Sequence, residues 1–130
     1  MSVSGMIMMD TAKAGTGITS SSRNLAVKVE AEGKYALASS SAAAVGIIDG
    51  DPLNGVISVV RMGKTRAVAG GSITCGNYVK SGANGKLVDA GAMGGIAATT
   101  NVVGQALEAA VANQVFTVWV QPVEITKPAT

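Results

Sequence analysis

Turn-forming residues divide the sequence into short apolar runs, and this spacing constrains the fold more than any other feature. Gly33, Gly50 and the pair Asn54-Gly55 fall between such runs. Glycine and asparagine accept the backbone conformations of tight turns more readily than other residues do. About eight runs have the length and composition of short strands. The pattern predicts an all-β fold, a small β-barrel or β-sandwich of short strands.

Two segments have the side-chain pattern of a strand most clearly. Residues 25–30 (LAVKVE) alternate as a half-buried strand does, and residues 115–120 (VFTVWV) are the most β-prone segment. The latter's expected faces are Val115, Thr117 and Trp119 on one side and Phe116, Val118 and Val120 on the other. The only helical candidate is segment 101–114, where Gly104 beside two valines disfavours a helix. A short helix or turn over residues 107–113 is the alternative there.

The two halves of the chain resemble each other. Residues 30–38 (EAEGKYALA) and 81–90 (SGANGKLVDA) share a Gly-Lys pair, and apolar runs around Gly46 and Gly104 follow them. Each half has a hairpin, an apolar run with glycine, a loop and a β-rich closing strand. This order predicts two related β units, with independently acquired turn chemistry as the rival explanation.

The expected organisation has three parts. Residues 1–22, rich in Gly, Ser, Thr and Met, form a mobile N-terminal arm. Such an arm is either a disordered tail or a segment that orders on a partner, for example by adding a strand to a sheet edge. Residues 23–122 form the β domain, with units at about 23–62 and 66–121. Residues 123–130 form a C-terminal tail.

Small side chains must build most of the core. Apolar residues make up 48% of the 130-residue chain, but aromatic residues only 3%, and there are 17 glycines. Each buried Ala or Val removes little area from water, so such a core gains less from burial than one rich in aromatic residues. Oligomerisation would add the missing burial.

Charge and cysteine content exclude several classes of protein. Ten basic and eight acidic residues are scattered along the chain, without the basic stripe that nucleic-acid binding requires. The single cysteine, Cys75, lies in a strand-like run and is expected to be a small buried residue rather than a reactive thiol. No segment has the length of a signal peptide's apolar region or of a membrane-spanning helix, so we expect neither secretion nor a membrane.

Catalytic motifs are absent from the sequence. There is no histidine, which removes His-dependent triads and the commonest general base. The Gly-rich segment 15–20 lacks the preceding strand and following helix of a phosphate-binding loop. Asp49 and Asp51 precede Gly55, but the glycine falls one position late for a calcium loop and no glutamate follows at the right distance. We expect no enzyme activity, no metal and no cofactor.

Two clusters are candidate contacts with a partner. The apolar cluster consists of Met6, Ile7, Met8 and Met9. The basic cluster consists of Arg61, Lys64 and Arg66, expected around a tight turn at Gly63, where a solvated hairpin tip is the alternative. Trp119, the only tryptophan, is a candidate for the core or an interface, with the strand core favoured.

The second half of the chain resembles a known family. Residues 70–88 follow the pattern GxxITxGxYVxSxxxGKLV, and VVGQALEAA at 102–110 and FTVWV at 116–120 follow. Together these segments resemble the small capsid cement, or head decoration, proteins of tailed bacteriophages, over about residues 70–121. The resemblance implies a small β protein on the outer surface of the virion, made in the bacterial host cytoplasm. There it would bind the major capsid protein and reinforce contacts between its subunits.

A trimer would suit the threefold axes of an icosahedral lattice, and a dimer on twofold axes is the alternative. The competing function is a carbohydrate- or cell-binding β module on a virion or cell surface. Such modules present aromatic side chains to sugars, and the aromatic residues here, Tyr35, Tyr78, Phe116 and Trp119, are few and lie in expected strands.

Overall fold

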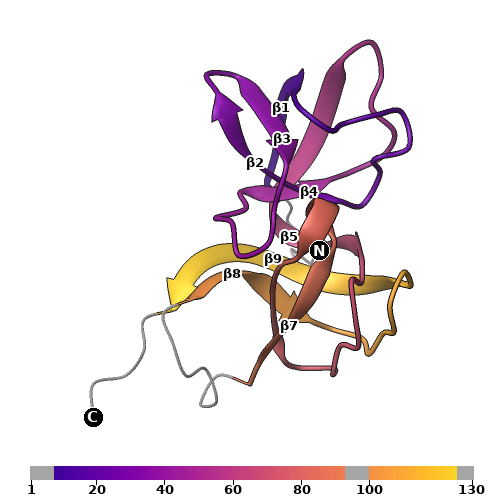
Figure 1. The fold of residues 1–130 in the computed structure, drawn as a ribbon, viewed down its shortest axis with the longest axis vertical. Helices are drawn as coiled ribbons and strands as arrows, with labels where there is room; N and C mark the ends of the chain where they lie inside the picture. Colours follow the sequence, from indigo (N-terminus) through magenta and orange to yellow (C-terminus); the bar gives the residue numbers. More distant parts are fainter. Residues whose placement is uncertain (1–7, 93–99, 126–130) are drawn as a thin grey trace, which may run out of the picture.

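The computed structural model describes residues 8–92 and 100–125. Over these ranges the chain forms nine β-strands and one 3-10 turn (Figure 1). The elements are β1 (Met8–Ala14), β2 (Ala26–Ala31), β3 (Lys34–Leu37), β4 (Gly46–Ile48), β5 (Val56–Val68), β6 (Tyr78–Ser81), η1 (Ala83–Gly85), β7 (Leu87–Gly91), β8 (Thr100–Ala106) and β9 (Val115–Ile125). The predicted all-β fold is confirmed. Residues 107–113 form turns rather than a helix.

The first five strands close into a barrel. They pair in the order β1-β3-β2-β4-β5, and β1 also pairs with β5, which joins the two ends of the sheet. The closing ladder is antiparallel and runs from Met9 opposite Val60 to Lys13 opposite Val56. In Figure 1 this first barrel, coloured indigo to magenta, lies above the rest of the chain.

The predicted N-terminal arm is wrong for residues 8–14. This segment is β1, which hydrogen-bonds to β5 on one side and to β3 on the other. Its side chains are exposed or half-buried throughout, so the segment lacks the apolar alternation that marks a strand in a sequence. The candidate residues Met6 and Ile7 lie outside the described residues. At the other end, β9 continues to Ile125, beyond the expected start of the tail at residue 123.

The predicted turn at Gly63 is also wrong. Strand β5 runs without interruption through Gly63, whose φ of 126° is accessible to glycine. The first half of β5 pairs with β1 and β4, and the second half pairs with β9. One strand therefore belongs to both halves of the molecule.

The second half of the chain repeats the pairing order of the first. β6 pairs with β7 and β8, β8 with β9, and β9 with the second half of β5, all antiparallel. In the first barrel, β2 pairs with β3 and β4, β4 with β5, and β5 with β1, also antiparallel. β2, β3, β4, β5 and β1 thus correspond to β6, β7, β8, β9 and the second half of β5. A parallel bridge between Ala69 and Leu87 corresponds to the parallel pairing of Ala14 with Tyr35. We call β5's second half with β6–β9 the second unit.

Two glycines occupy equivalent places in the two halves. Gly46 pairs with Val27, and Gly104 pairs with Val79. A Cβ atom added to Gly46 would collide with the backbone oxygen of Val60, and one added to Gly104 would collide with the backbone oxygen of Trp119. At both positions the neighbouring strand approaches too closely for any other residue.

The buried residues form two clusters. The smaller one fills the first barrel and consists of Val27, Tyr35, Ile48, Ile57 and Val59. The larger one fills the second unit around Phe116 and also includes Ala26, Ile47 and Val60, the sequence neighbours of three of the first barrel's core residues. Successive strand residues point to opposite faces. At these residues of β2, β4 and β5 the sheet of the first barrel is therefore buried on both faces, and it packs there against the second unit.

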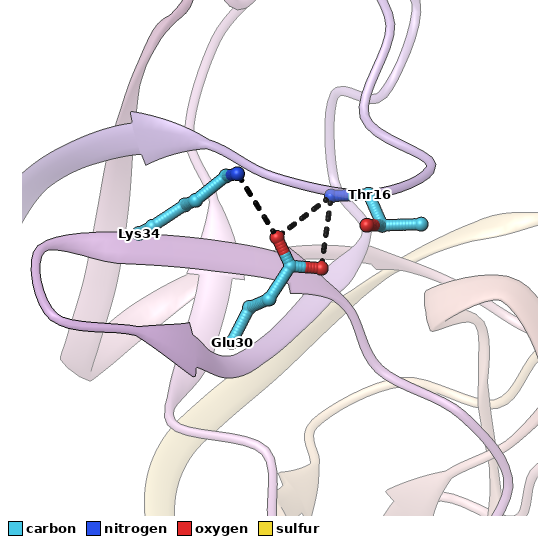
Figure 2. Close-up of polar contacts among 3 residues, drawn as sticks. All are labelled: Thr16, Glu30 and Lys34. Carbon is cyan, nitrogen blue, oxygen red and sulfur yellow. Dashed lines mark hydrogen bonds and ion pairs between the residues drawn. The ribbon is translucent and has the colours of Figure 1, made fainter.

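A carboxylate fixes the loop that follows β1. Glu30 on β2 accepts hydrogen bonds from the Thr16 backbone N–H, at 3.3 and 3.2 Å to its two oxygens. The Lys34 Nζ atom lies 3.5 Å from the same carboxylate (Figure 2). Hydrogen bonding from Thr16, with a smaller contribution from Lys34, lowers the pKa of Glu30. These contacts hold the loop against the β2–β3 hairpin.

Candidate interaction surface

A groove opens at the middle of β5, where two strands diverge. β1 pairs with β5 as far as Met62, and β9 pairs with β5 from Gly63 onward. Past Val120, β9 continues with β8 as its only strand partner among the described residues. The groove has a volume of about 530 Å³. Its lining residues are Met8, Met9, Asp10, Ala44, Val45, Arg61, Met62 and Pro122.

Methionines give the groove its apolar character. Met8, Met9 and Met62 are 58%, 51% and 39% exposed, and together they are half of the six methionines in the chain. Methionine has an unbranched, polarisable side chain that adapts to irregular apolar surfaces. Exposed apolar residues that gather in one place mark binding surfaces more often than isolated ones do. The groove can therefore accept apolar side chains of more than one shape.

A polar network supports one side of the groove. The Tyr35 hydroxyl donates a hydrogen bond of 2.6 Å to Asp10 Oδ2, and Arg61 Nη1 lies 3.6 Å from the same oxygen. The hydrogen bond from Tyr35, with help from Arg61, lowers the pKa of Asp10. The same hydrogen bond and burial raise the pKa of Tyr35. Arg61 is about half exposed, so several of its five N–H groups can still reach a partner.

Only some residues of the two predicted contact clusters line the groove. Met8, Met9 and Arg61 line it. Lys64 and Arg66 lie farther along β5, opposite Trp119 and Thr117 of β9, so the expected basic turn does not form. Hydrogen bonding from Thr117, followed by the positive charges of Arg66 and Lys64, lowers the pKa of Glu108. The basic residues are thus spread along a continuous strand.

Several groove residues were not expected from the sequence. Val45, Met62 and Pro122 come from three separate segments, and only the folded chain brings them together. Met62 had one usable signal, because it is an apolar residue next to a candidate arginine. Nothing in the local sequence marks Val45 or Pro122.

Trp119 is not in the core. It lies on the face of β9 opposite Phe116 and Val118, and it is half-buried. Its indole Nε1 donates to Gln121 Oε1 at 3.3 Å. The residue lines another, smaller groove of about 200 Å³ together with Tyr78 and Gln105. The aromatic face of β9 is therefore accessible.

Cys75 is exposed, which contradicts the expected buried position. The residue lies in the turn before β6, not in a strand, and its thiol contacts the Leu107 carbonyl at 3.4 Å. Within residues 8–92 and 100–125, no group of three or more His, Cys, Asp or Glu residues could hold a metal ion. No helix in those ranges has the length and apolarity to span a bilayer.

No protein-family model matches the sequence, and no curated protein sequence matches it. Among solved structures, the chain is similar to the N base of the head fiber protein gp8.5 of bacteriophage phi29. The two share 21% sequence identity with a TM-score of 0.63, over 92% of this chain and 98% of that one. At this level of identity, the similarity shows that the two chains share a fold over nearly their whole lengths.

Proposed function

We propose that the chain is a structural protein of a phage head that binds the outer surface of the capsid and stabilises contacts between major capsid protein subunits. The observation that carries this proposal is the fold shared with the head fiber base, which spans almost all of both chains. The sequence resemblance of residues 70–121 to head decoration proteins supports it independently.

The groove is the proposed capsid contact. Its three methionines would receive apolar side chains of a capsid subunit, and Arg61 would pair with an acidic group at the rim. Each contact of this kind contributes a modest binding free energy. A homotrimer would engage three capsid subunits at once, so that binding at one site raises the effective concentration at the others. This role requires no catalysis and no cofactor.

The binding test uses particles that lack the protein. Purified chain is added back, and bound protein is measured by co-sedimentation for wild type and for the variant Met8→Ser/Met9→Ser/Met62→Ser. We expect at least about a tenfold loss of affinity, since each serine removes apolar contact area. The control is Leu53→Ser, which changes a residue that is 71% exposed, beside the Asn54-Gly55 turn and outside the groove. Equal binding by the triple variant would refute the groove as the capsid contact.

The copy ratio of this chain to the major coat protein in particles tests the role itself. Quantitative mass spectrometry should give a simple fraction if the protein covers the lattice. A few copies per particle would instead favour a fibre base like that of the structural neighbour, and none would contradict a virion role. Light scattering on the purified chain tests the trimer.

A further inference from the structure

Four side chains form a row across the outer face of the second unit. Tyr78 on β6 is opposite Gln105 on β8, Gln105 is opposite Trp119 on β9, and Trp119 is opposite Lys64 on β5. Directly opposed residues in a sheet project from the same face. Gln105 and Lys64 are exposed, and the two aromatic residues are half-buried. We call these four residues the outer row.

The equivalent residues of the first barrel have a different character. Ala26 is opposite Ile47, and Ile47 is opposite Val60, in the same registers as Tyr78, Gln105 and Trp119. Those three residues are 0%, 0% and 2% exposed, because they belong to the core that the first barrel shares with the second unit. The second unit therefore has aromatic and amide side chains on an accessible face where the first barrel has buried aliphatic residues.

The amides beside the aromatic rings are already oriented. Gln105 Nε2 donates to the Gly76 carbonyl at 2.9 Å, and Gln121 Oε1 accepts from Trp119 at 3.3 Å. Gln105 keeps its carbonyl oxygen for a further hydrogen bond, and Gln121 keeps its amino group. Both amides line the same groove, which has a volume of about 200 Å³. One acceptor and one donor thus flank the indole ring.

We propose that the outer row is a binding site for an oligosaccharide. The apolar faces of successive sugar rings would stack on Tyr78 and Trp119, and their hydroxyls would bond to Gln105 and Gln121. Because β8 lies between β6 and β9, the two aromatic residues are about 10 Å apart, which suits neighbouring sugars of one chain better than a single ring. The proposal goes beyond the capsid role, and the outer row shares no residue with the capsid groove.

Other ligands fit the outer row less well. Nucleic acid would require several basic groups, whereas Lys64 is the only charged residue in the row and its charge also acts on Glu108. A permanently bound protein would favour aliphatic residues like those at the equivalent, buried face of the first barrel. Flat apolar rings beside hydrogen-bonding amides match the alternating C–H and hydroxyl surface of a sugar.

Trp119 is the only tryptophan, so its fluorescence reports on this site directly. The full chain is screened on a glycan array and then titrated with trisaccharides of N-acetylglucosamine, glucose and mannose and with any array hit. We expect a saturable change in Trp119 emission with at least one of these sugars. Tyr78→Ala and Gln105→Ala should each weaken binding by at least about tenfold. Val29→Ala, at a residue of β2 that is 59% exposed, should bind as wild type does.

Melting curves of all variants identify any that fail to fold, and Tyr78→Phe then replaces an unfolded Tyr78→Ala, with binding retained because the ring is kept. The proposal is overturned if no glycan binds, or if a folded Gln105→Ala variant binds as well as wild type. It is also overturned if the emission of Trp119 shifts with protein concentration alone and Tyr78→Ala abolishes that shift. That result would make the outer row an interface between copies of the chain.

Discussion

The substitution Gly104→Ala should destabilise the protein severely. A methyl group at this position would overlap the Trp119 backbone oxygen and lie 2.9 Å from its carbonyl carbon and 3.1 Å from the Val120 Cα atom. No side-chain rotation can relieve contacts with backbone, so β8 and β9 would have to separate. Overpacking usually costs about 1–3 kcal/mol, and each weakened ladder hydrogen bond adds about 1 kcal/mol. We expect a loss of about 3–5 kcal/mol in the free energy of unfolding.

Two matched variants complete this experiment. Gly46→Ala meets the same obstacle in the first barrel, but one of its close contacts, at 2.6 Å, is the Val59 side chain, which can move. Its expected loss is about 2–3 kcal/mol. Gly71→Ala is the control, because nothing lies within 4 Å of the added methyl group. It should change stability by less than about 0.5 kcal/mol or stabilise slightly.

Urea unfolding followed by far-UV circular dichroism measures all three variants. For a chain of this length, about 4 °C of melting temperature corresponds to 1 kcal/mol, so Gly104→Ala should melt about 10–20 °C lower than wild type. If Gly104→Ala unfolded at the same urea concentration as Gly71→Ala, the close strand approach would not be what requires glycine.

Three further outcomes are expected. The lowered pKa of Asp10 means that its contribution to stability is present above its ordinary pKa of 3.8 and is lost as pH falls through the lower folded value. The raised pKa of Tyr35 means that stability present below pH 10.0 is lost as pH rises through the higher folded value. Tyr35→Phe should therefore flatten both limbs of a plot of melting temperature against pH, and an unchanged plot would contradict the network. Deleting residues 1–14 removes β1 and opens the first barrel, so the melting temperature should fall; a mobile arm would leave it unchanged. Phe116→Ala should cost about 3–5 kcal/mol and Phe116→Leu clearly less, as urea unfolding would measure, because Phe116 is the largest fully buried side chain in the described chain.

The turns were predictable from the sequence because their cause is local. Gly33 has a φ of 67°, and Asn54 and Gly55 have φ values of 53° and 74° between the paired residues Leu53 and Val56. A two-residue turn with positive φ at both positions is the standard connection of a hairpin, and Asn-Gly is its strongest sequence signal. Wherever such a pair separated two β-prone runs, the prediction was right.

Features that depend on distant partners were not predictable in this way. Residues 25–30 were expected to be half-buried, but adjacent Ala26 and Val27 are both fully buried, because a core lies on each side of the sheet. Gly63 was interpreted as a turn although it lies inside β5, because glycine is typical of both turns and strand crossings. The groove could not be predicted, since its residues meet only when β1, β5 and β9 pair.

The continuity of β5 has a consequence for how the protein unfolds. A one-residue insertion or deletion at Gly63 would shift the second half of β5 against the first by one residue, so the first barrel and the second unit could not both keep their present packing. Because the two halves share β5 and also a buried cluster that includes Ile47, Val60 and Phe116, denaturation should be one all-or-none event. A force applied to either half would be transmitted to the other through β5, and the protein would respond as one mechanical element.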